Sequence, residues 1–96
     1  MMRVIWSAEA QKDVFDALEH YQQIDSTLAD EMALRIEHAT MPLLDFARIG
    51  SPVRGRAPLR KWTVPNSSFI LLYVAKEHVA EVRRVVHAAS DWQRHI

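Results

Sequence analysis

The sequence predicts an α+β fold with the order β-α-α-β-β-β, in which a helical hairpin packs on one face of a small, mainly antiparallel sheet. Three observations predict it. Two adjoining segments, 8–23 and 25–40, repeat apolar residues every three or four positions, as amphipathic helices do. One short segment rich in β-branched and aromatic residues precedes them, and three segments with strand character follow. The length of 96 residues fits a single domain spanning 1–96.

The first strand and the first helix adjoin each other. Residues 3–6 read Arg-Val-Ile-Trp, and such β-branched and aromatic residues favour a strand. Ser7 follows, a residue type preferred at the N-cap of a helix. Apolar residues from Ala10 to Tyr21 then form one stripe, which predicts a helix over about 8–23.

The second helix begins after a short connection. Asp25 or Ser26 is expected to cap it, and its apolar residues again recur at helical spacing. Pro42 lacks a backbone N–H and crowds the carbonyl four residues earlier, so the helix should end or bend near Thr40. Because only a few residues join the two helices, they should pack as an antiparallel hairpin.

The second half of the chain predicts strands. Glycines and prolines interrupt regular structure over 48–58. Strands are then expected over 59–64, 69–75 and 79–87, and the tight connections between them predict an antiparallel meander. The middle strand is almost wholly apolar, as expected of a central strand covered on both faces. The tail, 88–96, is predicted to be irregular.

The charge is divided sharply between the two halves. Residues 1–47 hold three basic and nine acidic side chains, a net charge of −6, whereas residues 48–96 hold nine basic and three acidic ones, a net charge of +6. This division indicates one acidic face and one basic face. The alternative is that acidic helices merely keep a basic sheet soluble.

Composition disfavours several classes of function. The chain has no cysteine, which excludes disulfides and thiolate metal sites and fits a cytoplasmic protein. The sequence contains neither a run of about 18 apolar residues nor a signal peptide, so no membrane association is expected. No phosphate-binding glycine motif occurs. We expect no cofactor. We also expect no metal, because the histidines lack ligand spacing: His20, His38, His78, His87 and His95.

Basic side chains of the loop and of the predicted strands are the strongest candidates for a binding surface. Adjacent strands of a meander bring residues that are distant in sequence close together. We expect these side chains to gather on the sheet face that the helical hairpin leaves uncovered. They are Arg54, Arg56, Arg60, Lys61, Arg83, Arg84 and His87.

Strict alternation in the last strand would separate its side chains into two sets. One face would carry Glu81, Arg83, Val85 and His87, and the other Ala80, Val82, Arg84 and Val86. Arg84 would then be the one charged residue on an apolar face. It would reach past the sheet edge, pair with an acidic residue or serve a site.

The aromatic residues have simpler interpretations. Trp6, Trp62 and Tyr73 are expected to pack in the core or on the sheet. Trp92 lies beside Asp91 in the tail and has two interpretations. It either tucks onto the sheet edge or projects into a partner.

Three segments of the closing half of the chain carry a family resemblance. Segments 59–64, 69–74 and 82–92 read Leu-Arg-Lys-Trp-Thr-Val, Phe-Ile-Leu-Leu-Tyr-Val and Val-Arg-Arg-Val-Val-His-Ala-Ala-Ser-Asp-Trp. They resemble the RelE/ParE superfamily of bacterial toxins, which typically has Gly-Leu-Arg-Glu, Tyr-Arg-Ile-x-Tyr-Arg-Val and Arg-Val-Leu-His-Gly-Ala-Arg-Asp-Trp at these places. Trp6, the predicted hairpin, Pro42 and the Gly/Pro/Arg loop match in the same order, so the resemblance covers nearly the whole chain.

The resemblance implies a toxin of a type II toxin–antitoxin system, and it favours the ParE-like branch. ParE-like members inhibit DNA gyrase, whereas RelE-like members cut messenger RNA on the ribosome. The family's arginines in the middle strand are replaced here by Ile70 and Val74. A ribonuclease would lose a cation that stabilises charge on the phosphate. The formal net charge of zero also contrasts with the basic balance expected of an RNA-binding protein.

Partners and site residues follow from the resemblance. It implies a cognate, ParD-like antitoxin lying over the basic sheet face and along the hairpin, and DNA gyrase as the target. One alternative is a RelE-like ribonuclease acting on the ribosome or mRNA, with His87 as acid or base and with Arg60 and Arg84 stabilising the phosphate. A second is a non-toxic, antitoxin-binding module in operon autoregulation. The target-binding residues expected are Arg54, Arg56, Arg60, Lys61, Arg83, Arg84, His87 and Trp92.

Overall fold

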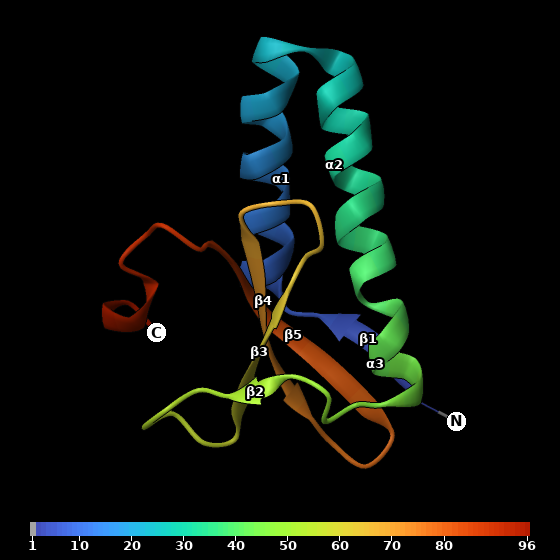
Figure 1. Cartoon of the computed structure of the whole chain (residues 1–96), viewed down its shortest axis with the longest axis vertical. Helices are drawn as coiled ribbons and strands as arrows, with labels where there is room; N and C mark the ends of the chain where they lie inside the picture. Colours follow the sequence, from blue (N-terminus) through green and yellow to red (C-terminus); the bar gives the residue numbers. More distant parts are fainter. Residues whose placement is uncertain (1) are drawn as a thin grey trace.

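The computed structural model describes residues 2–96, over which a helical hairpin covers one face of a five-stranded sheet of order β1-β5-β4-β3-β2 (Figure 1). β1 is parallel to β5, and the other neighbouring strands are antiparallel. The elements are β1 (Arg3–Trp6), α1 (Ala8–Ile24), α2 (Ser26–Ala39), α3 (Met41–Asp45), β2 (Ser51–Pro52), β3 (Leu59–Thr63), β4 (Phe69–Ala75), β5 (Val79–His87) and the 3-10 helix η1 (Trp92–Arg94). The predicted order β-α-α-β-β-β is confirmed.

The helix ends follow the capping residues. The Ser7 hydroxyl accepts a hydrogen bond from the Ala10 N–H, and the Asp25 carboxylate accepts one from the Thr27 N–H. α2 ends at Ala39, and Pro42 then falls within the first turn of α3, where proline is tolerated.

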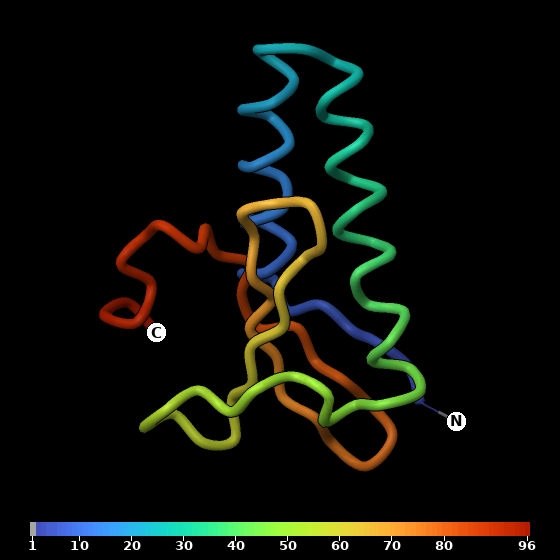
Figure 2. The backbone as a smooth tube through the Cα atoms, viewed as in Figure 1, coloured from blue at the N-terminus to red at the C-terminus, as the bar shows by residue number. Residues whose placement is uncertain are grey.

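The structure adds short elements to the predicted set. β2 is a two-residue strand that pairs with β3, and it lies inside the segment expected to be a loop. The tail was predicted to be irregular, but Trp92–Arg94 form one turn of 3-10 helix. Figure 2 shows the chain after β5 turning away from the helical hairpin before this last turn.

The sheet has an apolar core on each face. The core under the hairpin includes Leu43, Leu71, Tyr73 and Val82, all with no exposed surface. The expected packing of Trp6 and Trp62 is confirmed, because both contact this core. The second core lies on the opposite face, which is therefore covered in part rather than open. Its buried members are Val53, Leu72, Val86 and Trp92, with Leu59, Ile70 and Ile96 packed against them.

The strict alternation expected for the last strand is wrong. Arg84 lies opposite Leu72, whereas the next residue of β4, Tyr73, lies opposite Val82, so Arg83 is an extra residue in a β-bulge. The bulge inverts the side-chain pattern beyond it. Ala80, Val82 and Val85 therefore face the hairpin, while Glu81, Arg84 and Val86 share the opposite face.

Candidate functional site

The beginning of α1 covers the edge of β5 beyond the bulge. β1 pairs with β5 only as far as Val82 within the described chain, so another element must satisfy the backbone that follows. Ser7 donates its N–H to the Val82 carbonyl (2.9 Å) and its hydroxyl to the Arg83 carbonyl (2.8 Å). The Asp13 carboxylate accepts a hydrogen bond from the Val85 N–H at 2.9 Å. The helix thus substitutes for a neighbouring strand.

The same carboxylate holds Arg84. The Arg84 Nε lies 2.7 Å from Asp13 Oδ2, and its Nη2 lies 3.1 Å from Oδ1, which is a bidentate ion pair. The hydrogen bond that Arg84 donates to Asp13 raises the pKa of the Arg84 guanidinium, although partial burial opposes the shift. Arg84 is therefore engaged by an acidic residue, one of the alternatives that the sequence left open.

We expect Asp13→Ala to lower the free energy of unfolding by about 2–3 kcal/mol, because it leaves the Val85 N–H and the Arg84 guanidinium without their acceptor. Urea denaturation followed by circular dichroism measures the change. Asp16→Ala is the matched control, since Asp16 forms an exposed pair with Lys12 and should leave the midpoint unchanged. Equal midpoints for the two variants would show that the Asp13 contacts contribute nothing.

Arg60 and Tyr73 fix the loop that precedes β2. Arg60 Nη1 donates to the carbonyls of Gly50 (2.8 Å) and Arg48 (3.2 Å). The Tyr73 hydroxyl accepts a hydrogen bond from the Gly50 N–H at 2.9 Å. Burial raises the pKa of the Tyr73 phenol, while the Gly50 bond and the Arg60 charge act in the opposite direction. The Arg60 guanidinium is therefore already hydrogen-bonded to backbone carbonyls.

Arg56 and Trp92 hold the C-terminal segment on the sheet. Arg56 donates from Nε to the Ile96 carbonyl (3.2 Å) and from Nη2 to the Gln93 carbonyl (3.5 Å). The Trp92 side chain packs on Val53, and the residue is 5% exposed. Of the two interpretations, the tucked position is the one observed.

The remaining candidate residues are exposed. Arg54 and Lys61 make no hydrogen bond or ion pair through their side chains within residues 2–96. Arg83 projects from the bulge and pairs with Glu81, and this hydrogen bond lowers the pKa of the Glu81 carboxyl. The His87 ring packs edge-on against Phe69 and accepts a hydrogen bond from the Ala89 N–H.

The expectation that all these cations gather on one uncovered face is wrong. Arg60 lies opposite Tyr73, and His87 lies opposite Phe69, which places both on the hairpin side of the sheet. Lys61 and Arg84 both lie opposite Leu72, on the other side. The register of the strands therefore places these four side chains on two different faces, and the register could not be predicted from the sequence pattern.

A hollow of about 470 Å³ lies beside the tail. It brings Arg84 and His87 together with Ser90, Trp92 and His95. Asp91 also lines this hollow, and Asp13 already pairs with the Arg84 guanidinium, so His87 and His95 are the side chains left to contact an anion such as a phosphate. Over residues 2–96 no group of three or more histidine or acidic residues is placed to bind a metal ion.

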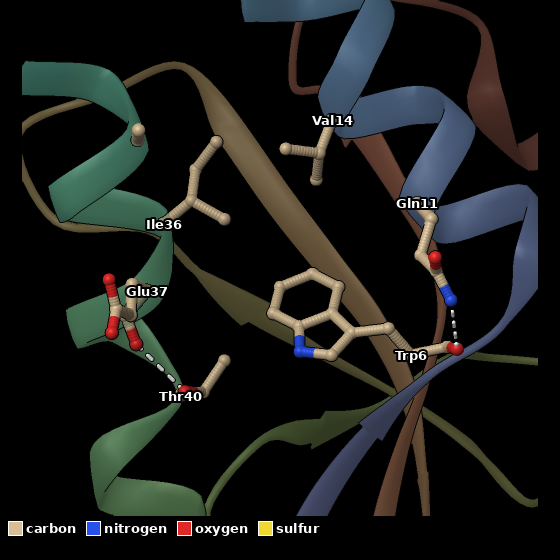
Figure 3. Close-up of a pocket in the computed structure, with 7 residues that line it drawn as sticks. Trp6, Gln11, Val14, Ile36, Glu37 and Thr40 are labelled. Carbon is tan, nitrogen blue, oxygen red and sulfur yellow. Dashed lines mark hydrogen bonds between the residues drawn. The ribbon is translucent and has the colours of Figure 1, made fainter. Parts of the chain in front are cut away.

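A groove between the two helices was not identified from the sequence. It has a volume of about 290 Å³, and the Trp6 ring extends between Val14 of α1 and Ile36 of α2 (Figure 3). Gln11 donates a hydrogen bond to the Trp6 carbonyl at 3.0 Å. The sequence carried no separate signal for it, because Val14, Ala33 and Ile36 belong to the apolar stripes that were expected to pack on the sheet. Phe15 and Leu34 fall outside those stripes and are exposed, but they do not line the groove.

The arrangement of elements defines the class of protein. A helical hairpin on a mixed sheet, closed by a strand that ends in His87 and a tail with Trp92, is the fold that the sequence resemblance to RelE/ParE-type toxins implied. The sequence profile described as "ParE toxin of type II toxin-antitoxin system, parDE" matches residues 4–92. The chain belongs to the ParE toxin family.

Solved structures show the same fold at low sequence identity. A structure of the chromosomal ParDE toxin–antitoxin system from P. aeruginosa superposes with a TM-score of 0.76 and 21% identity over 91% of this chain and 96% of that chain. YafQ from E. coli strain BL21(DE3) superposes with a TM-score of 0.54 and 19% identity, over 93% of this chain and 96% of YafQ. The matching chain of the E. coli DinJ–YafQ complex superposes with a TM-score of 0.53 and 17% identity, again over 93% of this chain and 96% of that chain. No curated protein matches the sequence. None of the helices within residues 2–96 is long and apolar enough to cross a membrane.

Proposed function

We propose that this ParE-type toxin inhibits DNA gyrase in the cytoplasm and is neutralised by a ParD-like antitoxin. The family match over residues 4–92 supports the branch. The observation that supports a non-catalytic mechanism is that Arg60 and Arg84 already bind other groups of the protein. Arg60 is bound to loop carbonyls and Arg84 to Asp13, so neither guanidinium is free to stabilise a phosphate in a reaction. A toxin with this site acts by binding a protein target.

The gyrase assignment is tested by a supercoiling assay. Purified toxin should inhibit the supercoiling of relaxed plasmid or trap the cleavage complex, and addition of the cognate antitoxin should restore the activity. The antitoxin alone is the control. Unchanged supercoiling at a large molar excess of folded toxin would rule out gyrase as the target.

The groove between α1 and α2 is the site where we place the antitoxin. An amphipathic segment would lay apolar side chains beside Trp6 and Ile36 and would cover surface that the lone domain exposes. The solved E. coli DinJ–YafQ toxin–antitoxin complex contains a chain of similar fold. We therefore expect the lone toxin to express poorly and co-expression with the antitoxin to rescue it.

Ala33→Arg should weaken antitoxin binding by about 10- to 100-fold, because a long charged side chain would fill the groove that Ala33 lines. The residue is only partly buried on α2, so the variant should fold. Isothermal titration calorimetry measures the change in affinity. Ala8→Arg, an exposed alanine on α1 outside the groove lining, is the matched control. Equal affinities for both variants would place the antitoxin elsewhere.

A ribonuclease is the second candidate, favoured by the hollow that brings Arg84, His87 and His95 together. His87 would transfer protons, and Arg84 would have to release Asp13 before it could bind the phosphate. Mapping of mRNA ends after induction tests this function, and His87→Ala should abolish the cleavage. Toxicity that survives His87→Ala would end this candidate. If the wild-type chain causes no growth arrest at all, the non-toxic, antitoxin-binding role gains support.

A further inference from the structure

Large apolar side chains project into solvent around α3 and the loop that follows it. We refer to them as the α3 corner, and they are Met41 (58% exposed), Leu44 (42%), Phe46 (66%) and Ile49 (44%). Leu43 between them has no exposed surface, so the helix has one buried and one exposed apolar face. Exposed apolar surface concentrated in one segment indicates a docking surface.

Hydrogen bonds within the chain order the backbone of the α3 corner. The Phe46 N–H donates to the Pro42 carbonyl at 2.9 Å, and the Ile49 N–H donates to the Phe46 carbonyl at 3.0 Å. The next residue, Gly50, is fixed by a buried hydrogen bond to Tyr73 and a partly buried one from Arg60. Such a surface loses little conformational entropy on binding, because its backbone is already ordered.

Two opposite charges lie within this segment. Asp45 and Arg48 are both exposed and flank Phe46 and the following alanine. Over residues 2–96, neither side chain takes part in an ion pair. The segment therefore carries an unpaired carboxylate, Asp45, and an unpaired guanidinium, Arg48, on either side of the exposed Phe46 ring.

We propose that the α3 corner binds a second copy of this chain about a two-fold axis. In a two-fold interface each patch meets its own image, so Asp45 of each copy would pair with Arg48 of the other. The apolar side chains would form the centre of the contact, and the reciprocal ion pairs would lie at its rim. A standard interface covers about 800 Å² on each partner, and the rim around the corner must supply part of that area.

This self-association is independent of the proposed antitoxin site. The α1–α2 groove is lined by Trp6, Gln11, Val14, Ala33, Ile36, Glu37 and Thr40, and it shares no residue with the corner. Variants of the corner should therefore change the oligomeric state and leave antitoxin affinity as it is.

Analytical ultracentrifugation of the antitoxin-free toxin tests the proposal. The wild type should sediment as a dimer at micromolar concentration. Asp45→Arg and Arg48→Asp should each weaken the dimer by at least about tenfold, since like charges then face each other. The double variant Asp45→Arg/Arg48→Asp should recover it. Phe46→Ser should give a monomer, while Phe15→Ser, at a side chain 65% exposed on α1, should remain dimeric.

Cross-linking keeps the test decisive if the lone toxin aggregates. The chain has no cysteine, so Ala47→Cys, between the two charges, introduces a single thiol. In permeabilised cells at low expression, an oxidant should link this variant into a dimer, whereas Ala8→Cys should stay monomeric. A monomeric wild type, or cross-linking at Ala47→Cys that Asp45→Arg leaves unchanged, would overturn the proposal.

Discussion

Replacing Trp92 by alanine should lower the free energy of unfolding by about 3–5 kcal/mol, the cost of deleting a large buried aromatic side chain. The indole packs with Val53, Leu72 and Val86 on the sheet face opposite the hairpin. Loss of the ring would expose this second core and detach the tail. Urea denaturation followed by circular dichroism, in parallel for wild type and variant, measures the change.

The matched variants separate packing from partner binding. Gln93→Ala changes the neighbouring exposed side chain and should leave stability unchanged. Trp92→Phe keeps much of the buried apolar area and should cost less than the alanine variant. If Trp92→Ala instead kept full stability and lost gyrase inhibition, Trp92 would be a target contact, the role that the sequence also allowed.

Periodicity was sufficient to predict the order of the elements because each helix and strand buries one face. The apolar stripe of α1 and the apolar run of β4 both match the observed cores. Register was harder to predict. The β-bulge at Arg83 has no glycine or proline to mark it, and the spacing of Val82 and Val85, which both face the hairpin, was the available sign. Strict alternation cannot place two residues three positions apart on the same face.

The candidate site was predicted less well, because its cations bind groups that side-chain patterns do not reveal. Arg60 binds backbone carbonyls, and any residue type supplies a carbonyl. Asp13 lies 71 positions from Arg84 and reads in the sequence as one more acidic residue on a helix surface. The groove between α1 and α2 depends on how far apart the helices lie, a distance set by packing against the sheet.

Replacing Gly50 by alanine should destabilise the domain by about 3 kcal/mol, through overlap with groups that have no free space. A Cβ at position 50 would lie 2.6 Å from the Tyr73 hydroxyl oxygen and 2.7 Å from the Lys61 carbonyl oxygen. Tyr73 is fully buried and Lys61 contributes backbone of β3, so neither can move cheaply. The alanine would therefore displace the loop and break the Gly50–Tyr73 hydrogen bond.

The other glycine of the chain is the control that isolates this cause. Gly55 has a positive φ of 74°, but nothing lies within 4 Å of a Cβ placed there. Gly55→Ala should cost about 1 kcal/mol, the strain of a left-handed backbone on a residue with a side chain. Thermal denaturation of both variants compares steric overlap with backbone strain. A larger loss for Gly55→Ala would mean that the loop before β2 yields easily, and that Arg60 and Tyr73 do not hold the α3 corner in a fixed shape.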